Sequence, residues 1–324
     1  MPQFPSLVLP CPITKSRVIS LALAALLGIF SSAGVNTLAN AQTKEVASAV
    51  NPVFTLYAAG DIADCRKKPA EQTMAARTAN LIDAELAKNK NAYVLTLGDN
   101  TYPIGRPEEF IHCYDKTWGK FKSLTLPSPG NHDYGVPMAA GYYNYFDELA
   151  GQQRRGYYKK KIGNWLLLSL NSNIKNQAMR DQITWLKNAL RSSQSSCVLA
   201  FWHHPVFSSG GHGNTQVMKE VWQILADAKA DIVLSSHDHN YERFAPLDKN
   251  GKPDKNGLRS FVVGTGGAKL TSMLFIKNGS EIRHNDSHGV LKLQLLNDSY
   301  RWEFLSVGGD NQQSFTDQGR ANCH

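Results

Sequence analysis

Residue types that bind metal ions recur in this sequence at, or just past, the ends of short strand-like runs. An aspartate and a tyrosine follow the run at 92–97, and another aspartate follows the run at 54–59. The whole set is Asp61, Asp99, Tyr102, Asn131, His203, His237 and His239. In open α/β sheets, ligands gather at the carboxyl ends of strands. Carboxylate, amide and imidazole donors together are typical of a pair of first-row metal ions, rather than of Ca²⁺ or of thiolate-bound zinc.

Taken one at a time, these residues have simpler interpretations. Asp61 could cap the helix that follows it, Asn131 could stand in a turn, and His203 could be a histidine of the core. Independent structural roles do not explain why oxygen and imidazole donors recur at successive strand ends. We therefore expect one shared ligand site, formed where several strands end.

Hydrophobic periodicity predicts the elements that must position these residues. Helices are predicted at 69–88, about 107–118, 177–190 and 216–228, and strands at 54–59, 92–97, 124–127, 157–158, 165–170, 197–202, 231–234, 261–263, 290–296 and 300–305. The first strand–helix–strand unit is typical of a parallel pair. Because helices and strands alternate first and strands dominate later, we expect an α/β fold in which two sheets pack together with helices outside.

The first 41 residues have the organisation of a cleavable signal peptide. Lys15 and Arg17 precede an apolar core at 18–30, and Ala39-Asn40-Ala41 is a small-residue cleavage site. Cleavage after Ala41 would leave residues 42–324 as one secreted or periplasmic domain. An uncleaved anchor is the alternative, but the core is short for a span of about 20 residues, and no later stretch could cross a bilayer. The net charge of +8 suits anionic substrates, while no lysine and arginine run indicates a nucleic-acid groove.

Four cysteines follow the signal segment, namely Cys65, Cys113, Cys197 and Cys323, and they allow three pairings. An even number in an exported chain predicts two disulfides, with buried free thiols as the alternative. Cys65 and Cys113 lie on segments that leave adjacent strand ends. Cys197 begins a strand at the pole opposite the ligands, and Cys323 lies on a polar tail at 311–324. We therefore predict the pairs 65–113 and 197–323.

Five short motifs occur in an order that resembles the calcineurin-like metallophosphoesterases. They are Gly60-Asp61, Gly98-Asp99-x-x-Tyr102, Gly130-Asn131-His132, His203-x-Pro205 and His237-x-His239. The resemblance runs from about residue 54 to 267 and is greatest to the purple acid phosphatase branch. Most of the family has a histidine ligand where this chain has Ala63, and the purple branch uses a tyrosine like Tyr102 instead. The resemblance implies a four-layer αββα sandwich of two mixed β-sheets flanked by helices.

The same resemblance implies a dinuclear metal centre. The implied ligands are Asp61, Tyr102 and His239 for the first ion, Asn131, His203 and His237 for the second, and Asp99 as the bridge. A phenol, with a free pKa of about 10, binds as phenolate only beside a strongly polarising ion. We therefore expect Fe³⁺ at the Tyr102 site and Zn²⁺, Mn²⁺ or Fe²⁺ at the other.

Two further histidines are implied to act in catalysis. His132 follows a ligand and is expected to contact the phosphate or to help the leaving group, and His212, in the glycine-rich loop 208–213, is a candidate general acid. The two ions would clamp the phosphate and lower the pKa of a water that attacks in line. Ser236 stands where the last motif usually begins with glycine. We expect this serine either to be tolerated or to shift His237 slightly.

The expected function is that of an exported, metal-dependent phosphatase that hydrolyses small phosphate monoesters. A phosphodiesterase or nucleotidase is the alternative, because the ligands do not separate ester types and loops such as 103–120 and 133–160 make that choice. A non-catalytic, exported metal-binding protein is a third interpretation. The absence of thiolates that would close the site, and the presence of His132 and His212, argue against it. Nothing in the sequence indicates an oligomeric state.

Overall fold

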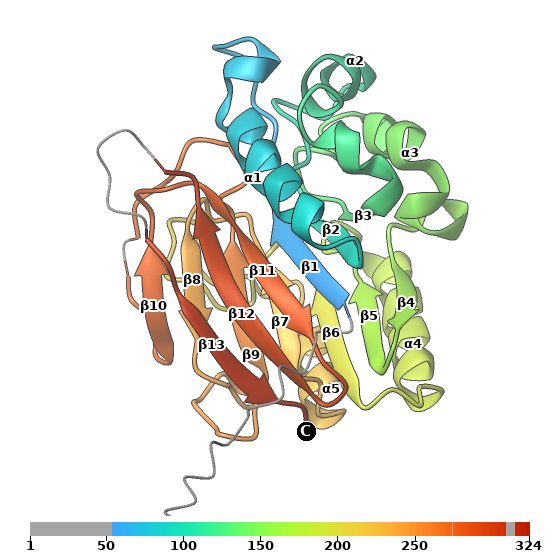
Figure 1. The fold of residues 1–324 in the computed structure, drawn as a ribbon. Coiled ribbons are helices and arrows are strands. Elements are labelled where there is room, and N and C mark those ends of the chain that lie inside the picture. The colour runs from blue at the N-terminus through green and yellow to red at the C-terminus, as the bar shows by residue number, and fades with distance from the viewer. Residues whose placement is uncertain (1–53, 274, 309–314) are drawn as a thin grey trace, which may run out of the picture. The chain divides into compact units, whose positions relative to one another are not determined.

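Two mixed β-sheets with helices on their outer faces make up the part of the chain described by this computed structural model, residues 54–273, 275–308 and 315–324 (Figure 1). This arrangement confirms the predicted α/β sandwich of four layers. The predicted signal peptide, with its cleavage site, lies outside the described residues. None of the helices in the described ranges combines the length and the apolar character that a membrane span requires.

The first sheet has six strands in the order β13-β12-β11-β1-β2-β3. These strands are β1 (Phe54–Ala59), β2 (Ala92–Leu97), β3 (Thr125–Ser128), β11 (Gly289–Leu295), β12 (Ser299–Ser306) and β13 (Gln318–Asn322). The pairs β1–β2 and β2–β3 are parallel, as predicted for the first, whereas β11, β12 and β13 join antiparallel. The carboxyl ends of β1, β2 and β3 therefore meet at one edge of this sheet.

The second sheet has seven strands in the order β10-β8-β9-β7-β6-β5-β4. They are β4 (Tyr158–Ile162), β5 (Trp165–Ser169), β6 (Cys197–Phe201), β7 (Ile232–Ser235), β8 (Tyr241–Phe244), β9 (Arg259–Val263) and β10 (Ser280–His284). Strands β5, β6, β7 and β9 are mutually parallel, and the hairpin β4–β5 turns at Gly163-Asn164 as predicted. The ends of β6 and β7 thus also share one edge.

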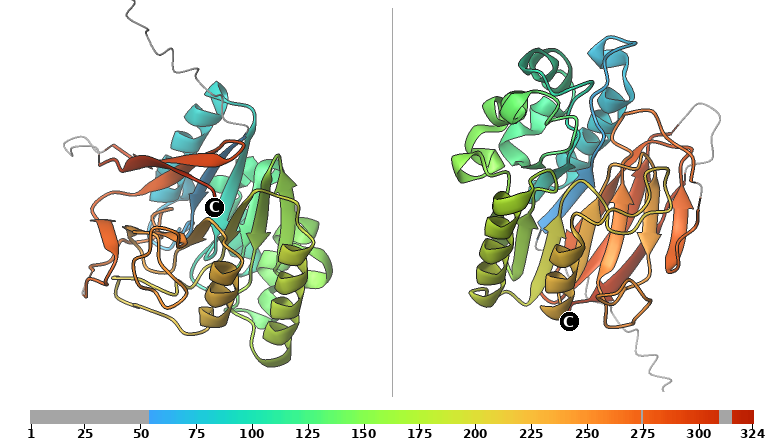
Figure 2. Two further views of the ribbon diagram at one scale, coloured as in Figure 1. Left: turned by 90° about the horizontal axis from the view of Figure 1, so that it is seen from below. Right: turned by 180° about the vertical axis from the view of Figure 1, so that it is seen from behind.

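Helices lie on the outer face of each sheet but leave part of it uncovered, as at β12 and β13 of the first sheet (Figure 1 and Figure 2). The helices are α1 (Met74–Lys88), α2 (Pro107–Glu109), α3 (Ala140–Phe146), α4 (Asn176–Arg191) and α5 (Lys219–Asp227). The predicted helix at 69–88 begins only at Met74, because Thr73 is its N-cap and accepts a hydrogen bond from the backbone N–H of Ala76. The predicted helix at about 107–118 is instead the short α2 followed by a π-helical turn, Phe110–Tyr114.

Side-chain alternation along the second sheet separates two apolar layers. Leu167, Leu199 and Leu234 belong to the cluster that also contains the core of the first sheet. Their neighbours Leu168 and Ala200 belong to the cluster that also contains residues of α4 and α5. Because successive side chains of a strand point to opposite faces, each strand contributes to both layers. This packing holds the two sheets in fixed register, so that their strand ends can form one site.

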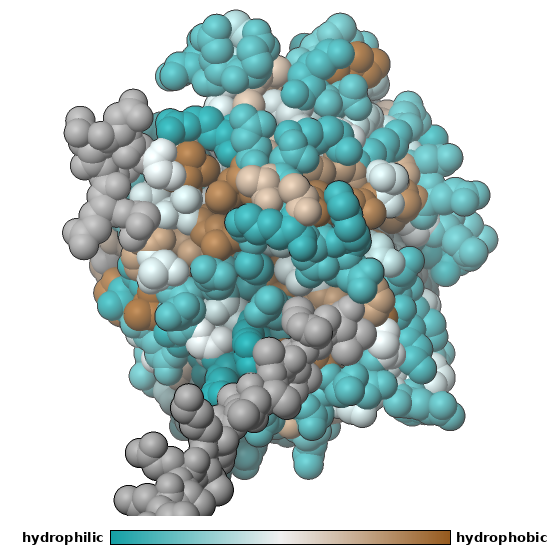
Figure 3. Space-filling model, viewed as in Figure 1, coloured by the Kyte–Doolittle hydropathy of each residue, from teal (hydrophilic) through white to brown (hydrophobic). Residues whose placement is uncertain are grey.

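Three strands were not predicted, namely β8, β10 and β13. The polar tail at 311–324, for which no strand was predicted, contains β13 over Gln318–Asn322. Its strand is held by a backbone ladder to β12 rather than by burial of its own side chains. The exposed face shown in Figure 3 is largely hydrophilic, and its apolar residues appear only in small, separated areas.

Candidate metal centre

The carboxyl ends of parallel strands from both sheets carry the seven predicted ligands. Asp61 follows β1, Asp99 and Tyr102 follow β2, and Asn131 follows β3, all in the first sheet. The ligands of the second sheet are His203 after β6 and His237 and His239 after β7. One donor atom from each of Asp61, Asp99 and His203 lies within 4.8 Å of the other two, although the three are widely separated in sequence. The structure therefore brings together the residues that the sequence singled out.

Asp61, Tyr102 and His239 converge as one set of donors, which we call the tyrosine group. The phenol oxygen of Tyr102 lies 3.0 Å from Asp61 Oδ1 and 3.2 Å from His239 Nε2. His239 Nε2 in turn lies 3.3 Å from Asp61 Oδ1. Two oxygens and one imidazole nitrogen therefore face a common point.

Asn131, His203 and His237 form a second set of donors, which we call the histidine group. His203 Nε2 lies 3.0 Å from Asn131 Oδ1 and 3.1 Å from His237 Nδ1. One amide oxygen and two imidazole nitrogens thus converge, in contrast to the oxygen-rich tyrosine group.

Asp99 contacts both groups through one carboxylate oxygen. Its Oδ2 atom lies 3.2 Å from the phenol oxygen of Tyr102 and 3.4 Å from His203 Nε2. Its Oδ1 atom accepts a hydrogen bond of 2.8 Å from the backbone N–H of His132. The backbone contact fixes the carboxylate between the two sets of donors.

The backbone turns sharply where these ligands leave their strands. Asp61, Asp99 and His237 all have positive φ, at 57°, 49° and 70°. Such left-handed conformations are uncommon for residues with side chains and gather at functional sites. Glycine is required at position 98, because it has a φ of +91° and a Cβ there would lie 2.6 Å from His203 Nδ1. The tight turn after β2 therefore allows a histidine of the other sheet to approach Asp99.

Burial and neighbouring charges shift the pKa values of the histidines in opposite directions. Burial by itself would lower the pKa of His203 and of His239, but Asp99 and Asp61 raise the first, and Asp61 the second, to about 9. Burial, together with the imidazoles of His203 and His204, lowers the pKa of His237 to about 2. His237 is therefore neutral over the physiological range, which is the state in which an imidazole binds a metal ion.

The carboxylates of Asp61 and Asp99 disfavour ionisation of the nearby Tyr102 phenol. Burial, and then the carboxylates of Asp61 and Asp99, raise the pKa of Tyr102 well above its ordinary value. Burial would raise the pKa of Asp61 too, but His239 and the other imidazoles hold it below its usual range. A phenolate can exist beside two carboxylates only with a strongly polarising cation among them. The donor set therefore fits a hard, highly charged metal ion.

Both predicted catalytic histidines lie beside the two donor groups. His132 Nδ1 is 2.5 Å from the carbonyl oxygen of Pro103, and its Nε2 is 3.8 Å from Asp99 Oδ2. The side chain of His132 is 38% exposed, so it is open to solvent. The ring of His212 is centred 4.3 Å from that of His237, and its side chain is 53% exposed. Both imidazoles are thus accessible next to the candidate ligands.

Two residues beside the centre were given no role by the sequence. Asp238, fully buried, accepts a hydrogen bond of 2.8 Å from the backbone N–H of His212, and its Oδ1 lies 3.0 Å from His212 Nδ1. The one sequence feature that could have drawn attention to Asp238 is its place between His237 and His239 in the last motif. The second is His204, which follows the candidate ligand His203 and has its Nδ1 2.8 Å from Ser172 Oγ.

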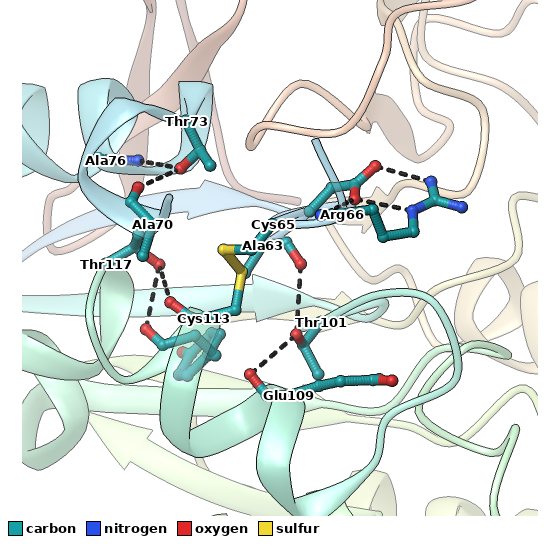
Figure 4. The surroundings of a disulfide bond; sticks show 12 residues. Ala63, Cys65, Arg66, Ala70, Thr73, Ala76, Thr101, Glu109, Cys113 and Thr117 are labelled. Atoms are coloured by element: carbon teal, nitrogen blue, oxygen red, sulfur yellow. Dashed lines mark hydrogen bonds and ion pairs between the residues drawn. A yellow bond between two sulfur atoms is a disulfide. The ribbon is translucent and has the colours of Figure 1, made fainter. Parts of the chain in front are cut away.

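The two disulfides are those predicted, Cys65–Cys113 and Cys197–Cys323. The first joins the segment after β1 to the π-helical turn Phe110–Tyr114, and Figure 4 shows it near Ala63 and Thr101. Two residues before Cys65, the carbonyl oxygen of Ala63 accepts hydrogen bonds from the backbone N–H of Tyr102 and from the hydroxyl of Thr101. The bridge therefore supports the loops that present Asp61 and Tyr102.

Comparison with known proteins decides the family. Residues 43–241 match the family model of the calcineurin-like phosphoesterases. The chain belongs to this family. Members of the family have a dinuclear metal centre, which agrees with the two donor groups that share Asp99.

Purple acid phosphatases are among the proteins to which this calcineurin-like phosphoesterase is similar. It is 24% identical to purple acid phosphatase 18 of Arabidopsis thaliana, over 62% of this chain and 52% of that protein. It is also 24% identical to tartrate-resistant acid phosphatase type 5 of Sus scrofa, over 72% of this chain and 74% of that protein. These similarities support the purple acid phosphatase-like branch.

A solved structure shares the fold. The purple acid phosphatase PPD1 from seeds of yellow lupin, Lupinus luteus, superposes with a TM-score of 0.62 at 18% sequence identity. The match covers 83% of this chain and 53% of the lupin chain. The chain thus spans about half the length of the two plant proteins it matches, and about three quarters of the pig protein.

Proposed function

We propose that this chain is a dinuclear-metal phosphoesterase that hydrolyses small phosphate monoesters. The observation that carries the proposal is Asp99, whose Oδ2 atom contacts the tyrosine group on one side and the histidine group on the other. A carboxylate in that position can bridge two cations, and two-metal sites act on phosphate esters by clamping the phosphate and activating water. The catalytic unit proposed is one domain, residues 42–324.

The two donor groups favour different ions. In the tyrosine group, a phenol and a carboxylate beside one imidazole suit Fe³⁺, which is polarising enough to bind a phenolate. In the histidine group, two imidazoles and an amide suit Zn²⁺, Mn²⁺ or Fe²⁺. Asp61, Tyr102 and His239 are thus the proposed ligands of the first ion.

His132 is proposed to act on the phosphate. Its Nδ1 lies 2.5 Å from the carbonyl oxygen of Pro103, which makes Nδ1 the donor and aims Nε2 toward the Asp99 carboxylate, 3.8 Å away. An exposed imidazole at this distance can donate a hydrogen bond to a phosphate oxygen or a proton to the leaving group. His132 therefore has a role in turnover without being a metal ligand.

His212 is proposed as the general acid, held in place by Asp238. The buried carboxylate of Asp238 contacts both the backbone nitrogen and the Nδ1 atom of His212, so the ring is held in place although about half of the side chain is exposed. With Nδ1 donating to Asp238, Nε2 is left to carry the proton that a departing alkoxide needs.

Export is part of the proposal. A signal peptide at 1–41 would direct the chain to a secreted or periplasmic location, and the two disulfides support an oxidising compartment. Phosphodiesterase or nucleotidase activity on the same site is the alternative, because the donor groups do not distinguish the ester types.

Turnover of p-nitrophenyl phosphate, compared with its bis ester over a range of pH, tests the proposed function. We expect the metal-loaded protein to hydrolyse the monoester faster at every pH. Faster turnover of the diester would favour the alternative activity. Absence of turnover of either ester by protein that contains two metal ions per chain would contradict an enzymatic function.

A further inference from the structure

Ser236 is a buried polar residue directly under the candidate metal centre. It stands between the end of β7 and His237, where the motif usually has glycine, and its side chain is fully buried. Its hydroxyl oxygen lies 2.6 Å from the carbonyl oxygen of Leu97 and 3.0 Å from His203 Nδ1. Leu97 ends β2 in the first sheet, whereas His203 follows β6 in the second. One hydroxyl therefore contacts the ends of strands from both sheets.

The hydroxyl has room because the first motif has glycine opposite it. A Cβ on Gly60 would lie 2.3 Å from Ser236 Oγ and 2.6 Å from Ser236 Cβ, closer than atoms can approach. Gly60 immediately precedes Asp61, so the missing side chain in the first motif leaves the space that the Ser236 side chain of the last motif occupies. The serine is accommodated without separating the histidine group, since His237 Nδ1 is still 3.1 Å from His203 Nε2.

The count of protons determines the direction of each hydrogen bond. A serine hydroxyl has one proton, and a carbonyl oxygen only accepts. The short contact of 2.6 Å to the carbonyl of Leu97 therefore takes the proton of Ser236. Toward His203 Nδ1 the hydroxyl can then only accept, so Nδ1 carries a hydrogen. The same Nδ1 atom also lies 3.0 Å from the carbonyl oxygen of Leu97.

We propose that Ser236 is a positioning residue that holds His203 with its Nδ1–H directed inward and its Nε2 lone pair directed at the metal centre. Nε2 is the atom that lies 3.0 Å from Asn131 Oδ1 and 3.4 Å from Asp99 Oδ2. Partners that accept the second N–H of a metal-bound histidine fix its tautomer and its ring orientation. This role rests on the proposed metal centre, but the hydrogen bond itself does not depend on it.

Exchange of the His203 Nδ1 proton with solvent tests the hydrogen bond. In protein labelled with ¹⁵N-histidine, the signal is assigned by its absence in the His203→Gln variant. We expect Ser236→Ala and Ser236→Gly, which both remove the hydroxyl, to exchange this proton about 2- to 10-fold faster, as the loss of one net hydrogen bond predicts. Ser235→Ala is the matched control, because Ser235 is equally buried but donates to the carbonyl oxygen of Phe261.

Affinity for Zn²⁺, measured by chelator competition, tests the consequence. We expect Ser236→Ala and Ser236→Gly to weaken the histidine-group ion about 10- to 100-fold, while any absorption from Tyr102 and iron stays unchanged. Equal exchange and equal affinity in wild type and both variants would overturn the proposal. If the wild-type protein bound no metal, the proposed function would fail, and the exchange measurement would still decide the role of Ser236.

Discussion

The two donor groups differ in chemistry although they share one carboxylate and one edge of the fold. In the tyrosine group, Asp61 and Tyr102 come from loops of the first sheet, and a disulfide supports those loops. In the histidine group, His203 and His237 follow adjacent strands of the second sheet, and no described cysteine lies in their loops. Asp99 thus lies between one set of donors that is mainly oxygen and another that is mainly nitrogen.

His239 of the tyrosine group and His237 of the histidine group have shifted pKa values, and the two shifts have opposite directions. His239 lies against the Asp61 carboxylate, which raises its pKa to about 9 against the effect of burial. His237 lies among imidazoles, which together with burial lower its pKa to about 2. By donor type, the tyrosine group has a carboxyl and a phenol, which suit a hard cation, and the histidine group has an amide and two imidazoles, which suit a divalent ion of borderline softness.

Removal of the Asp99 carboxylate should have the largest effect, because this carboxylate contacts donors of both groups. We expect Asp99→Asn to reduce phosphatase activity by more than about 10⁴-fold and to lower the content of both ions. Metal analysis beside the activity assay checks this. Retention of two ions per chain would show that Asp99 does not bridge them.

Tyr102→Phe should weaken metal binding by the tyrosine group but not by the histidine group. The variant lacks the phenol oxygen, so we expect it to lose about one metal ion per chain and any visible charge-transfer band, while Zn²⁺ stays in the histidine group. Absorption spectra and metal analysis of the oxidised protein measure both effects. A colourless wild-type protein that is fully active with zinc alone would refute the iron assignment and leave the fold unaffected.

His132→Ala should slow turnover without loss of metal. The imidazole lies 3.8 Å from Asp99 but contacts neither donor group as a ligand, so we expect about 10²–10⁴-fold lower kcat if it takes part in proton transfer. Steady-state kinetics and metal analysis check this together. Metal loss as large as in Asp99→Asn would show that His132 is a ligand.

Removal of each disulfide in turn should affect the two groups unequally. The bridges span 48 and 126 residues, so each would contribute about 4–5 kcal/mol to the free energy of unfolding in the chain-entropy model. Only the paired change Cys65→Ser with Cys113→Ser should also weaken the tyrosine-group ion, because that bridge supports the loop of Asp61. Cys197→Ser with Cys323→Ser is the matched control. Equal weakening of metal binding by both would remove this distinction.

The smallest expected effect concerns Glu242, whose carboxylate accepts hydrogen bonds from Ser209 in the loop that carries His212. Burial raises the pKa of Glu242, although Ser209 and Ser280 donate hydrogen bonds to its carboxylate. Between the unfolded pKa of about 4.3 and the raised folded value, only the folded chain holds this proton. The contribution of Glu242 is therefore complete below the unfolded pKa and is lost as the pH rises through the folded pKa.

Urea unfolding of wild type and Glu242→Gln from pH 4 to 8 measures this contribution. We expect the stability of the wild type relative to the variant to fall as the pH rises, because glutamine does not titrate. A difference that is the same at every pH would mean that folding does not raise the pKa of Glu242.

Local signals in the sequence were sufficient for much of the fold. The strands at 54–59, 92–97 and 197–202 are continuous apolar runs, and their bounds agree with the structure to within one residue. By contrast, β8, β10 and β13 contain several charged or polar residues each and are held by backbone pairing with other strands. Their formation depends on a partner strand, which a local pattern does not contain.

The identity and spacing of the candidate ligands were determined by the sequence alone, because each follows a strand whose apolar run is recognisable. The pairing of the cysteines also followed from the positions of strand ends. Only the tertiary structure decided which donors meet, that Asp238 holds His212, and that Ser236 lies against His203. The donors meet because the two sheets pack face to face, which brings the strand ends of the first sheet to those of the second. The contacts of Asp238 with His212 and of Ser236 with His203 lie within the second half of the fold, between segments 26 and 33 residues apart along the chain.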